Sequence, residues 1–445
     1  MNARGLLKVK MLLSIVTASA LIVLSACGGT VSESSQTTQK PAAVKPKEKT
    51  KLKVLGFGSW FKEGMDAVLK DASEKMGIEL EIEKVPEGDD GVKLVRTRFA
   101  TKDLPDILLW SAGLTESQNL GIPSETFVSQ DDQPWISNFD KNSWKGAMDS
   151  EDGLFYGAPY GGMNSAVVLY NKKVFEGLEL QVPKTLEEFW SVSEKIKKSG
   201  KIPVYLSGKD SWTLQLPPFM AQARPGLSEF FKKVNVNQAK LSDWSDQKRG
   251  LVFIQDVIAK GYVNKEFLSD SYDNAQKALA DGDAGMYLMA TWVMADISKK
   301  YPDKVNDIGA FIMPFEGNGA DRVGLFAPNS MYIVKGKNQD AAQQFVNYFE
   351  SIDTQNIYFA NEGGIPAIKG VTVTKLTPAE IEAQKLIDSG RASAVYSISK
   401  YAWDSDFGSL TQGLAAGGKS PEQVQESIWN TFVKNAKSKD DPNFK

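Results

Sequence analysis

Tryptophan is the side chain in this sequence that is best suited to chemistry with a ligand. The 445-residue chain has ten tryptophans, and several stand beside polar or glycine residues. The set with such neighbours is Trp60, Trp110, Trp212, Trp292 and Trp403. An indole stacks on the apolar C–H face of a sugar, while neighbouring amides, hydroxyls and carboxylates bond its hydroxyl groups. One such tryptophan is as easily a large core residue, so only the set indicates saccharide binding.

The other tryptophans lie in helical or loop contexts, and we expect them to pack in the core. They are Trp135, Trp144, Trp190, Trp244 and Trp429.

Residue types that are missing exclude several enzyme classes. The chain has no histidine, and its one cysteine is Cys27. Without them there is no Ser-His-Asp or Cys-His nucleophile and no usual zinc ligand set. No Gly-rich phosphate loop of the G-x-x-x-x-G-K-[ST] type is present. We therefore expect no catalysis, no cofactor and no metal, although a calcium site made of carboxylates stays open.

Two carboxylates can hydrolyse a glycoside without histidine, so a glycosidase remains an alternative. Carboxylates are abundant, with 55 Asp and Glu, but no spacing selects a pair. The 52 Lys and Arg nearly balance them, for a net charge of −3. This balance gives no electrostatic case for nucleic acid, which requires a clustered basic surface.

The amino terminus predicts export and a lipid anchor. Arg4, Lys8 and Lys10 precede an apolar run from Met11 to Leu24, which is too short to span a membrane comfortably. The run closes on Leu24-Ser25-Ala26-Cys27, which resembles the lipobox at which bacterial lipoproteins are diacylated and cleaved. An ordinary secretory signal with an incidental cysteine is the alternative. From Gly28 to about Lys51 almost nothing can be buried, so we expect a flexible tether.

The remaining sequence alternates strand and helix patterns, which predicts an α/β protein with a largely parallel sheet. Met65, Val68 and Ala72 recur at helical spacing up to Gly77, and Ile78 to Glu83 alternates apolar and acidic residues. Capping sequences begin helices at Thr185 and Ser420. Further strands are expected at 52–55, 107–110, 166–170, 202–206, 285–290 and 331–334, and a further helix over 342–349.

Five segments are similar, in the same order, to segments of one protein family. These are a Pro-Asp-hydrophobic strand, a strand ending in Tyr-Asn-Lys, a Pro-x-Thr-x-x-Glu helix start, a segment ending in tryptophan and a Gly-x-Pro-Ala turn. They occupy Leu104–Trp110, Gly157–Asn171, Val182–Phe189, Ala278–Met286 with Ala290–Trp292, and Gly363–Ala367. Through them, residues from about 51 to 432 resemble the extracellular carbohydrate-binding proteins of ABC importers, the family that includes maltose-binding protein. The chain departs from the family at Ala290, where a glycine commonly precedes the tryptophan by two residues.

The resemblance implies a two-lobe, type II periplasmic-binding-protein-like α/β fold with the ligand in a cleft between discontinuous lobes. The expected crossings lie near Asn164–Leu169, Val323–Ser330 and Val371–Thr377. The expected parts are a signal peptide (1–26), a lipidated cysteine with its tether (27–50), lobe 1 (51–165 and 327–373) and lobe 2 (166–326 and 374–445).

We also expect roles for particular residues. Trp110, Trp212, Trp292 and Trp403 are expected to stack on sugar faces. Asn164 and Asp210 are expected to bond hydroxyl groups. Trp60 is placed at the rim of the cleft, and Tyr160 is a further candidate.

The implied partners are a saccharide, with an oligosaccharide favoured, and the permease subunits of an ABC importer. The protein is expected to be a monomer held by lipid at the extracytoplasmic face of the cell membrane. A sensor subunit that presents the ligand to a membrane receptor is the third alternative. The many aromatic residues favour saccharides over amino acids, which usually require a paired arginine and carboxylate.

Overall fold

The structure is a computed structural model that describes residues 49–86, 89–113, 120–139, 141–144, 147–317, 319–396, 399–404 and 406–445. The predicted signal peptide, Cys27 and nearly all of the predicted tether lie outside these residues. Within the described ranges, no helix is both long and apolar enough to cross a membrane. Residues 48–445 form one compact unit, which contains two sheets.

The first sheet has the strand order β2-β1-β3-β10-β4. Its strands are β1 (Thr50–Phe57), β2 (Ile78–Val85), β3 (Ile107–Trp110), β4 (Gly157–Tyr160) and β10 (Asn329–Ile333). β1 runs parallel to β2 and β3, whereas β10 pairs antiparallel with β3 and β4. Because of these directions, the ends of β1, β3 and β4 and the start of β10 meet at one edge of the sheet.

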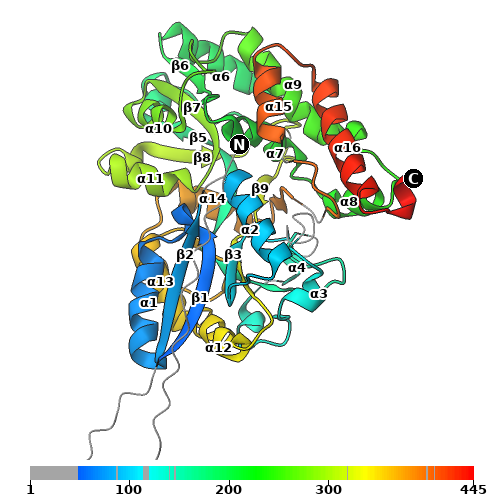
Figure 1. The fold of residues 1–445 in the computed structure, drawn as a ribbon. Helices are drawn as coiled ribbons and strands as arrows, with labels where there is room; N and C mark the ends of the chain where they lie inside the picture. The colour runs from blue at the N-terminus through cyan, green and yellow to red at the C-terminus, as the bar shows by residue number, and fades with distance from the viewer. Residues whose placement is uncertain are drawn as a thin grey trace, which may run out of the picture. The chain divides into compact units, whose positions relative to one another are not determined.

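The second sheet is built around β5 (Gly162–Asn171), whose residues 165–169 are fully buried. Its path is β12-β9-β5-β7-β6, and β8 and β11 also pair with β5. The other strands are β6 (Ile202–Tyr205), β7 (Ala284–Ala290), β8 (Ile308–Phe311), β9 (Val323–Phe326), β11 (Ile365–Pro366) and β12 (Ala392–Ala394). Figure 1 labels β1–β3 of the first sheet, in blue to cyan, and β5–β8 of the second sheet, in shades of green.

The chain passes between the two sheets along strands. β4 of the first sheet leads directly into β5 of the second through Gly161, whose φ of 78° is a left-handed conformation that glycine adopts without strain. β9 of the second sheet leads back into β10 of the first across Ala327 and Pro328. The third predicted crossing, Val371–Thr377, occupies the segment between β11 and the helix that begins at Pro378. The lobe boundaries themselves stay a prediction.

Both sheets are mixed rather than largely parallel, so that expectation is corrected. β5 is antiparallel to β7, β8 and β9, although β6 and β7 are parallel, as are β9 and β12. β4 and β5 carry the chain from the first sheet to the second, and β9 and β10 carry it back. β9 is therefore antiparallel to β5, and β10 is antiparallel to β4. A local sequence pattern can indicate a strand but not its direction relative to a distant neighbour.

The helices confirm the predicted periodic segments. α1 ends at Met76 and is capped by Gly77, α6 begins after Thr185, α12 covers the predicted stripe, and α16 begins after Ser420 with a full capping box. The α-helices of the described residues are α1 (Glu63–Met76), α2 (Asp89–Thr101), α3 (Pro123–Thr126), α4 (Lys141–Trp144), α5 (Lys172–Gly177), α6 (Leu186–Lys198), α7 (Leu216–Gln222), α8 (Leu227–Asn235), α9 (Ser245–Ala259), α10 (Tyr272–Asp281), α11 (Val293–Lys300), α12 (Gln339–Phe349), α13 (Ile352–Glu362), α14 (Pro378–Asp388), α15 (Phe407–Ala415) and α16 (Pro421–Lys437).

The capping box predicted at Thr185 is only half formed. The Thr185 side chain accepts a hydrogen bond from the Glu188 amide, as a capping residue should. The Glu188 carboxylate, however, accepts from the amide of Lys184 at 2.6 Å rather than from that of the capping residue. The helix start is still satisfied, because the carboxylate bonds the chain one residue earlier.

Candidate functional site

A cleft of about 660 Å³ is lined by residues of both sheets. Ser59 and Ser111, which follow β1 and β3, face it from the first sheet, together with Asn329 at the start of β10. Thr291 follows β7 of the second sheet on the opposite side. Ligands of α/β proteins commonly bind outside the carboxyl ends of strands, because the loops there leave backbone and side chains free. This cleft is therefore the candidate site.

Five aromatic rings form a continuous row along the cleft, which we call the aromatic row. In order, they are Tyr272, Trp212, Trp292, Phe326 and Tyr396. The successive ring centroids are 5.1, 6.2, 4.9 and 6.0 Å apart. All five belong to the strands of the second sheet or to the segments around them. Such a row offers an extended apolar surface for flat or ring-shaped ligands.

Asp210 positions one end of the aromatic row. Its Oδ2 accepts a hydrogen bond of 2.7 Å from the amide of Tyr272, the first residue of α10. The 3-10 helix Ser211–Gln215, which carries Trp212, begins directly after Asp210. Asp210 thereby ties two aromatic residues that are distant in sequence, but it is not among the residues that line the cleft.

Trp292 is held at the middle of the row by the preceding strand. Its neighbour Thr291 bonds twice to Ser165 of β5, since the Thr291 amide donates to the Ser165 carbonyl and the Ser165 amide donates to Thr291 Oγ1, both at 3.0 Å. Ala290 is fully buried and pairs with Ala166. The methyl group that departs from the family pattern therefore packs inside the sheet and does not line the cleft.

Charged groups in the cleft are few, and they are mainly acidic. Lys62 is the one cation among the described lining residues, and its Nζ pairs with Glu362 at 2.9 Å. Asp296 accepts a hydrogen bond of 3.1 Å from the hydroxyl of Tyr272. Glu380 accepts from both the amide and the hydroxyl of Thr377 at 2.8 Å, as part of the cap of α14. Each charged group therefore already has a protein partner.

Burial sets the protonation of the cleft's tyrosines. It raises the pKa of Tyr160, Tyr272, Tyr358 and Tyr396 above the ordinary value of a phenol. Asp296 beside Tyr272 raises the pKa of that phenol further. Burial likewise raises the pKa of the Glu380 carboxyl. All four phenols are therefore protonated at neutral pH and act as hydrogen-bond donors.

Five of the predicted site residues line the cleft: Trp60, Tyr160, Asn164, Trp212 and Trp292. Trp212 is 40% exposed, whereas Tyr160 is only 3% exposed and its hydroxyl donates to the carbonyl of Trp60 at 2.6 Å. The side-chain amide of Asn164 donates to the Gly162 carbonyl at 3.2 Å. Their contact with a ligand stays a prediction.

Two predicted tryptophans lie in the core instead of lining the cleft. Trp110 is 2% exposed and stacks on Phe57, with ring centroids 5.3 Å apart. Trp403 is 4% exposed and packs against Trp244 and Phe407 at 5.9 and 5.6 Å. Of the tryptophans expected to pack, Trp190 is partly buried and the other four are buried.

Several lining residues were missed by the sequence analysis. They include Lys62, Tyr272, Phe326, Tyr358, Glu362 and Tyr396. Phe326 had the clearest signal, because it is an aromatic residue within the predicted crossing Val323–Ser330. Tyrosine and phenylalanine at equivalent strand ends carry the same signal as the tryptophans. In the described part of the chain, no three Asp, Glu, His or Cys side chains gather as a metal site.

Comparisons with known proteins agree on one family. The model of the bacterial extracellular solute-binding protein family matches residues 56–356. An uncharacterized ABC transporter extracellular-binding protein of Pyrococcus horikoshii is 23% identical over 398 residues, or 87% of each chain. The multiple sugar-binding protein of Streptococcus mutans is 26% identical over 331 residues, 72% of this chain and 76% of that protein.

A solved structure gives the same result for the fold. The SBP RafE, a Streptococcus pneumoniae protein, in complex with raffinose has a TM-score of 0.69 at 19% identity. The likeness covers 86% of this chain and 99% of that one. The predicted fold class, α/β with two lobes of the type II periplasmic-binding-protein kind, is thereby confirmed.

Proposed function

Because this chain belongs to the family of bacterial extracellular solute-binding proteins, we propose that it captures a saccharide outside the cytoplasmic membrane and delivers it to an ABC importer. It catalyses no reaction in this proposal. The name of the Streptococcus mutans relative and the raffinose bound to the similar structure support a saccharide as the ligand. The extracellular-binding protein of an ABC transporter among the relatives supports delivery to permease subunits.

The observation that carries the proposal is the aromatic row, together with the polar groups that face the same cleft. Rings 4.9–6.2 Å apart can each stack on a sugar face. Ser59, Ser111 and Asn329 line the cleft from the first sheet and supply groups that bond hydroxyls. A row of five rings suits an oligosaccharide better than a single sugar.

The charges of the cleft favour a neutral saccharide over a phosphorylated one. Lys62, the one described cation in the cleft, is already paired with Glu362, and Asp296 adds a further carboxylate. A phosphate group is normally bound by arginine, lysine or a helix N-terminus with free donors. An anionic ligand would therefore have to displace an existing ion pair and approach like charges.

Capture and release of the ligand depend on its contacts with both lobes. A saccharide that contacts residues of both sheets stabilises the closed arrangement, because only that arrangement provides both sets of contacts. We propose that hinge motion takes place where the chain passes between the sheets, at Gly161–Asn164, at Ala327–Pro328 and near Val371–Thr377. The closed shape is then the form that the importer recognises.

Calorimetric titration of the purified protein with a panel of neutral oligosaccharides tests the function. We expect saturable binding of at least one of them, much weaker binding of its phosphorylated form, and unchanged affinity in EDTA. Incubation with nitrophenyl glycosides is expected to release no nitrophenol. Turnover of a glycoside would support the alternative of a glycosidase that uses paired carboxylates. Binding of an amino acid but of no saccharide would contradict the proposal.

We further propose that Cys27 carries the lipid anchor. Cys27→Ala removes the acylation site, so the variant is expected to move from the membrane fraction into the medium, as followed by fractionation and immunoblotting. Its saccharide affinity should equal that of the wild type, because the described residues that line the cleft begin at Ser59. Retention in the membrane fraction with unchanged processing would instead favour an anchor other than the cysteine.

A further inference from the structure

A second cavity of about 600 Å³ lies outside the cleft and shares no lining residue with it. Its walls come from α14, from β8 with the residues that follow it, and from the segment 182–184 before α6. We propose that this cavity is a binding site for a small amphipathic anion, whose apolar body lies in the cavity and whose charged group is bound by Arg391 and Lys385. We call it the lateral cavity.

The interior of the lateral cavity is largely apolar. Its apolar lining residues are Val182, Pro183, Phe311, Ile312, Pro314 and Leu386. Val182 is 37% exposed, so part of this apolar lining is open to an occupant. A cavity of this volume with apolar walls and a few polar groups has the size and character of small-molecule sites.

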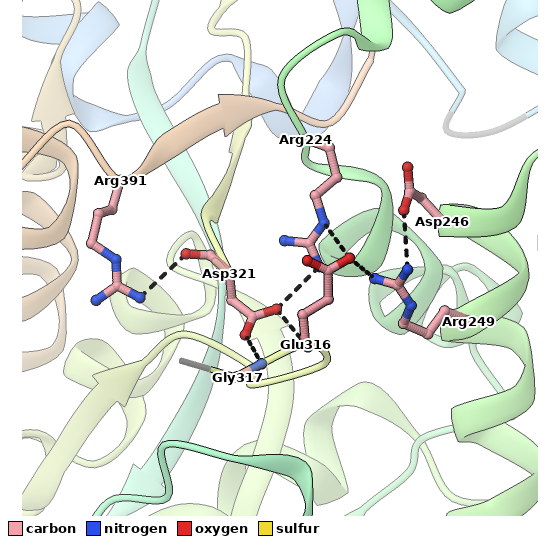
Figure 2. A network of polar contacts seen from close by, with 7 residues as sticks. All are labelled: Arg224, Asp246, Arg249, Glu316, Gly317, Asp321 and Arg391. Atoms are coloured by element: carbon pink, nitrogen blue, oxygen red, sulfur yellow. Dashed lines mark hydrogen bonds and ion pairs between the residues drawn. The ribbon is translucent and has the colours of Figure 1, made fainter. Parts of the chain in front are cut away.

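The two carboxylates of the lateral cavity are already satisfied within the protein. Asp321 is 3% exposed; its Oδ1 accepts from Arg224 and from the Glu316 amide at 3.0 Å, and its Oδ2 accepts from the Gly317 amide at 2.7 Å. Figure 2 shows this carboxylate turned toward Arg224 and the Gly317 amide. Glu382 accepts from the Ala310 amide and pairs with Lys172.

The cations of the lateral cavity, in contrast, have hydrogen-bond donors or charges without a partner among the described residues. Arg391 donates through Nη2 to the Asp321 carbonyl at 3.2 Å, as Figure 2 shows, but its buried Nε has no hydrogen-bond partner. Neither Lys184 nor Lys385 forms an ion pair with any residue that the structure describes. The Nη1 donors of Arg391 also have no partner among the described residues, and they are not closed off as Nε is, so an anion in the cavity can accept from them.

Taken together, these features select the chemistry of the ligand. The carboxylates of the lateral cavity are paired within the protein, whereas its cations are not, so the cavity presents positive charge beside an apolar surface. The complementary ligand has an apolar body and one anionic head. A carboxylate or sulfonate fits the fork of an arginine with two parallel hydrogen bonds. A neutral saccharide has neither feature, which separates this site from the cleft.

Fluorescence titration with anilinonaphthalene sulfonate tests the proposal, with the uncharged phenylnaphthylamine as the matched probe. We expect the sulfonate to bind one saturable site on the full-length protein. Arg391→Met should weaken its binding about ten- to hundredfold, as the loss of a charge-assisted hydrogen bond predicts. Binding of the uncharged probe should hardly change. Lys385→Met, on a more exposed side chain, should give a smaller loss in the same direction.

The controls locate the site. Arg249→Met removes a cation of the same network that does not line the lateral cavity, and it should leave the sulfonate's affinity unchanged. Trp292→Ala in the cleft should also leave it unchanged. Unfolding midpoints of Arg391→Met and Lys385→Met confirm that the fold is kept. Equal binding by both variants and the wild type, or displacement of the probe by a saccharide, would overturn the proposal.

Displacement experiments identify the source of the anion. Free laurate should displace the sulfonate, because it has the same combination of an apolar body and one negative charge. Phosphatidylglycerol vesicles should not displace it. A lipid held in a bilayer cannot place both its headgroup and its acyl chain in a cavity of this size. Displacement by vesicles but not by laurate would assign the surface to a membrane and would contradict a small-molecule site.

Discussion

Replacing Trp292 by alanine is expected to weaken saccharide binding by about one to three orders of magnitude, because it removes the central ring of the aromatic row. Truncation of a buried aromatic anchor costs about 2–4 kcal/mol of binding free energy, and each 1.4 kcal/mol is tenfold in affinity. Trp292 lies within 6.2 Å of Trp212 and 4.9 Å of Phe326, so it links the two halves of the row. Calorimetric titration of the variant measures the loss.

The unfolding midpoint without ligand distinguishes this role from ordinary packing. Trp292 is partly exposed in the cleft, so its removal should change the midpoint little. Trp244 is the control, because it is only 4% exposed and packs against Phe231 and Trp403 away from the cleft. Trp244→Ala should lower the midpoint and keep the affinity. Normal saccharide affinity of Trp292→Ala together with a much lower midpoint would assign Trp292 to the core.

Replacing Asp321 by alanine is expected to destabilise the fold by about 3–5 kcal/mol, the cost of removing one partner of a buried ion pair. Glu316, whose carboxylate lies 3.8 Å from Arg224 Nε, is the remaining acid beside the arginine. The side chains of Arg224 and Asp321 are only 10% and 4% exposed. The variant leaves the Arg224 guanidinium without its 3.0 Å partner and removes the acceptor of the Glu316 and Gly317 amides. Urea unfolding followed by tryptophan fluorescence measures the change in the free energy of unfolding.

Asp246→Ala is the matched control for this prediction. Asp246 pairs with Arg249 in the same network (Figure 2), but their side chains are 32% and 33% exposed. Solvent weakens such a pair to about 0–1 kcal/mol, so the control should unfold almost like the wild type. Equal free energies of unfolding for Asp321→Ala and Asp246→Ala would show that burial does not strengthen the Arg224–Asp321 pair.

Much of the fold could be predicted from the sequence because its signals are local. The spacing of Met65, Val68 and Ala72 marks one helix face, and Ser420 with Gln423 forms the capping box that begins α16. These patterns depend on contacts within three or four residues, which the order of amino acids determines directly. The resemblance to one family supplied the two-lobe arrangement, which no local pattern contains.

The direction of strands could not be predicted in the same way. Neighbours in the second sheet come from distant segments, such as β5 beside β7, β8 and β9. A buried strand has the same apolar composition in a parallel or an antiparallel pair, so composition does not decide between them. The mixed sheets therefore became apparent only from the structure.

The residues of the candidate site could likewise be predicted only in part. The sequence by itself determined that the chain carries tryptophans beside polar residues and lacks the histidine that most catalytic and zinc sites need. Only the tertiary structure decided that Trp212 and Trp292 line the cleft whereas Trp110 and Trp403 are buried. The physical reason is that one position along a strand or loop reverses the face on which a side chain lies, and Ser111 faces the cleft where Trp110 does not. Which face becomes the cleft depends on strands brought together from distant parts of the chain.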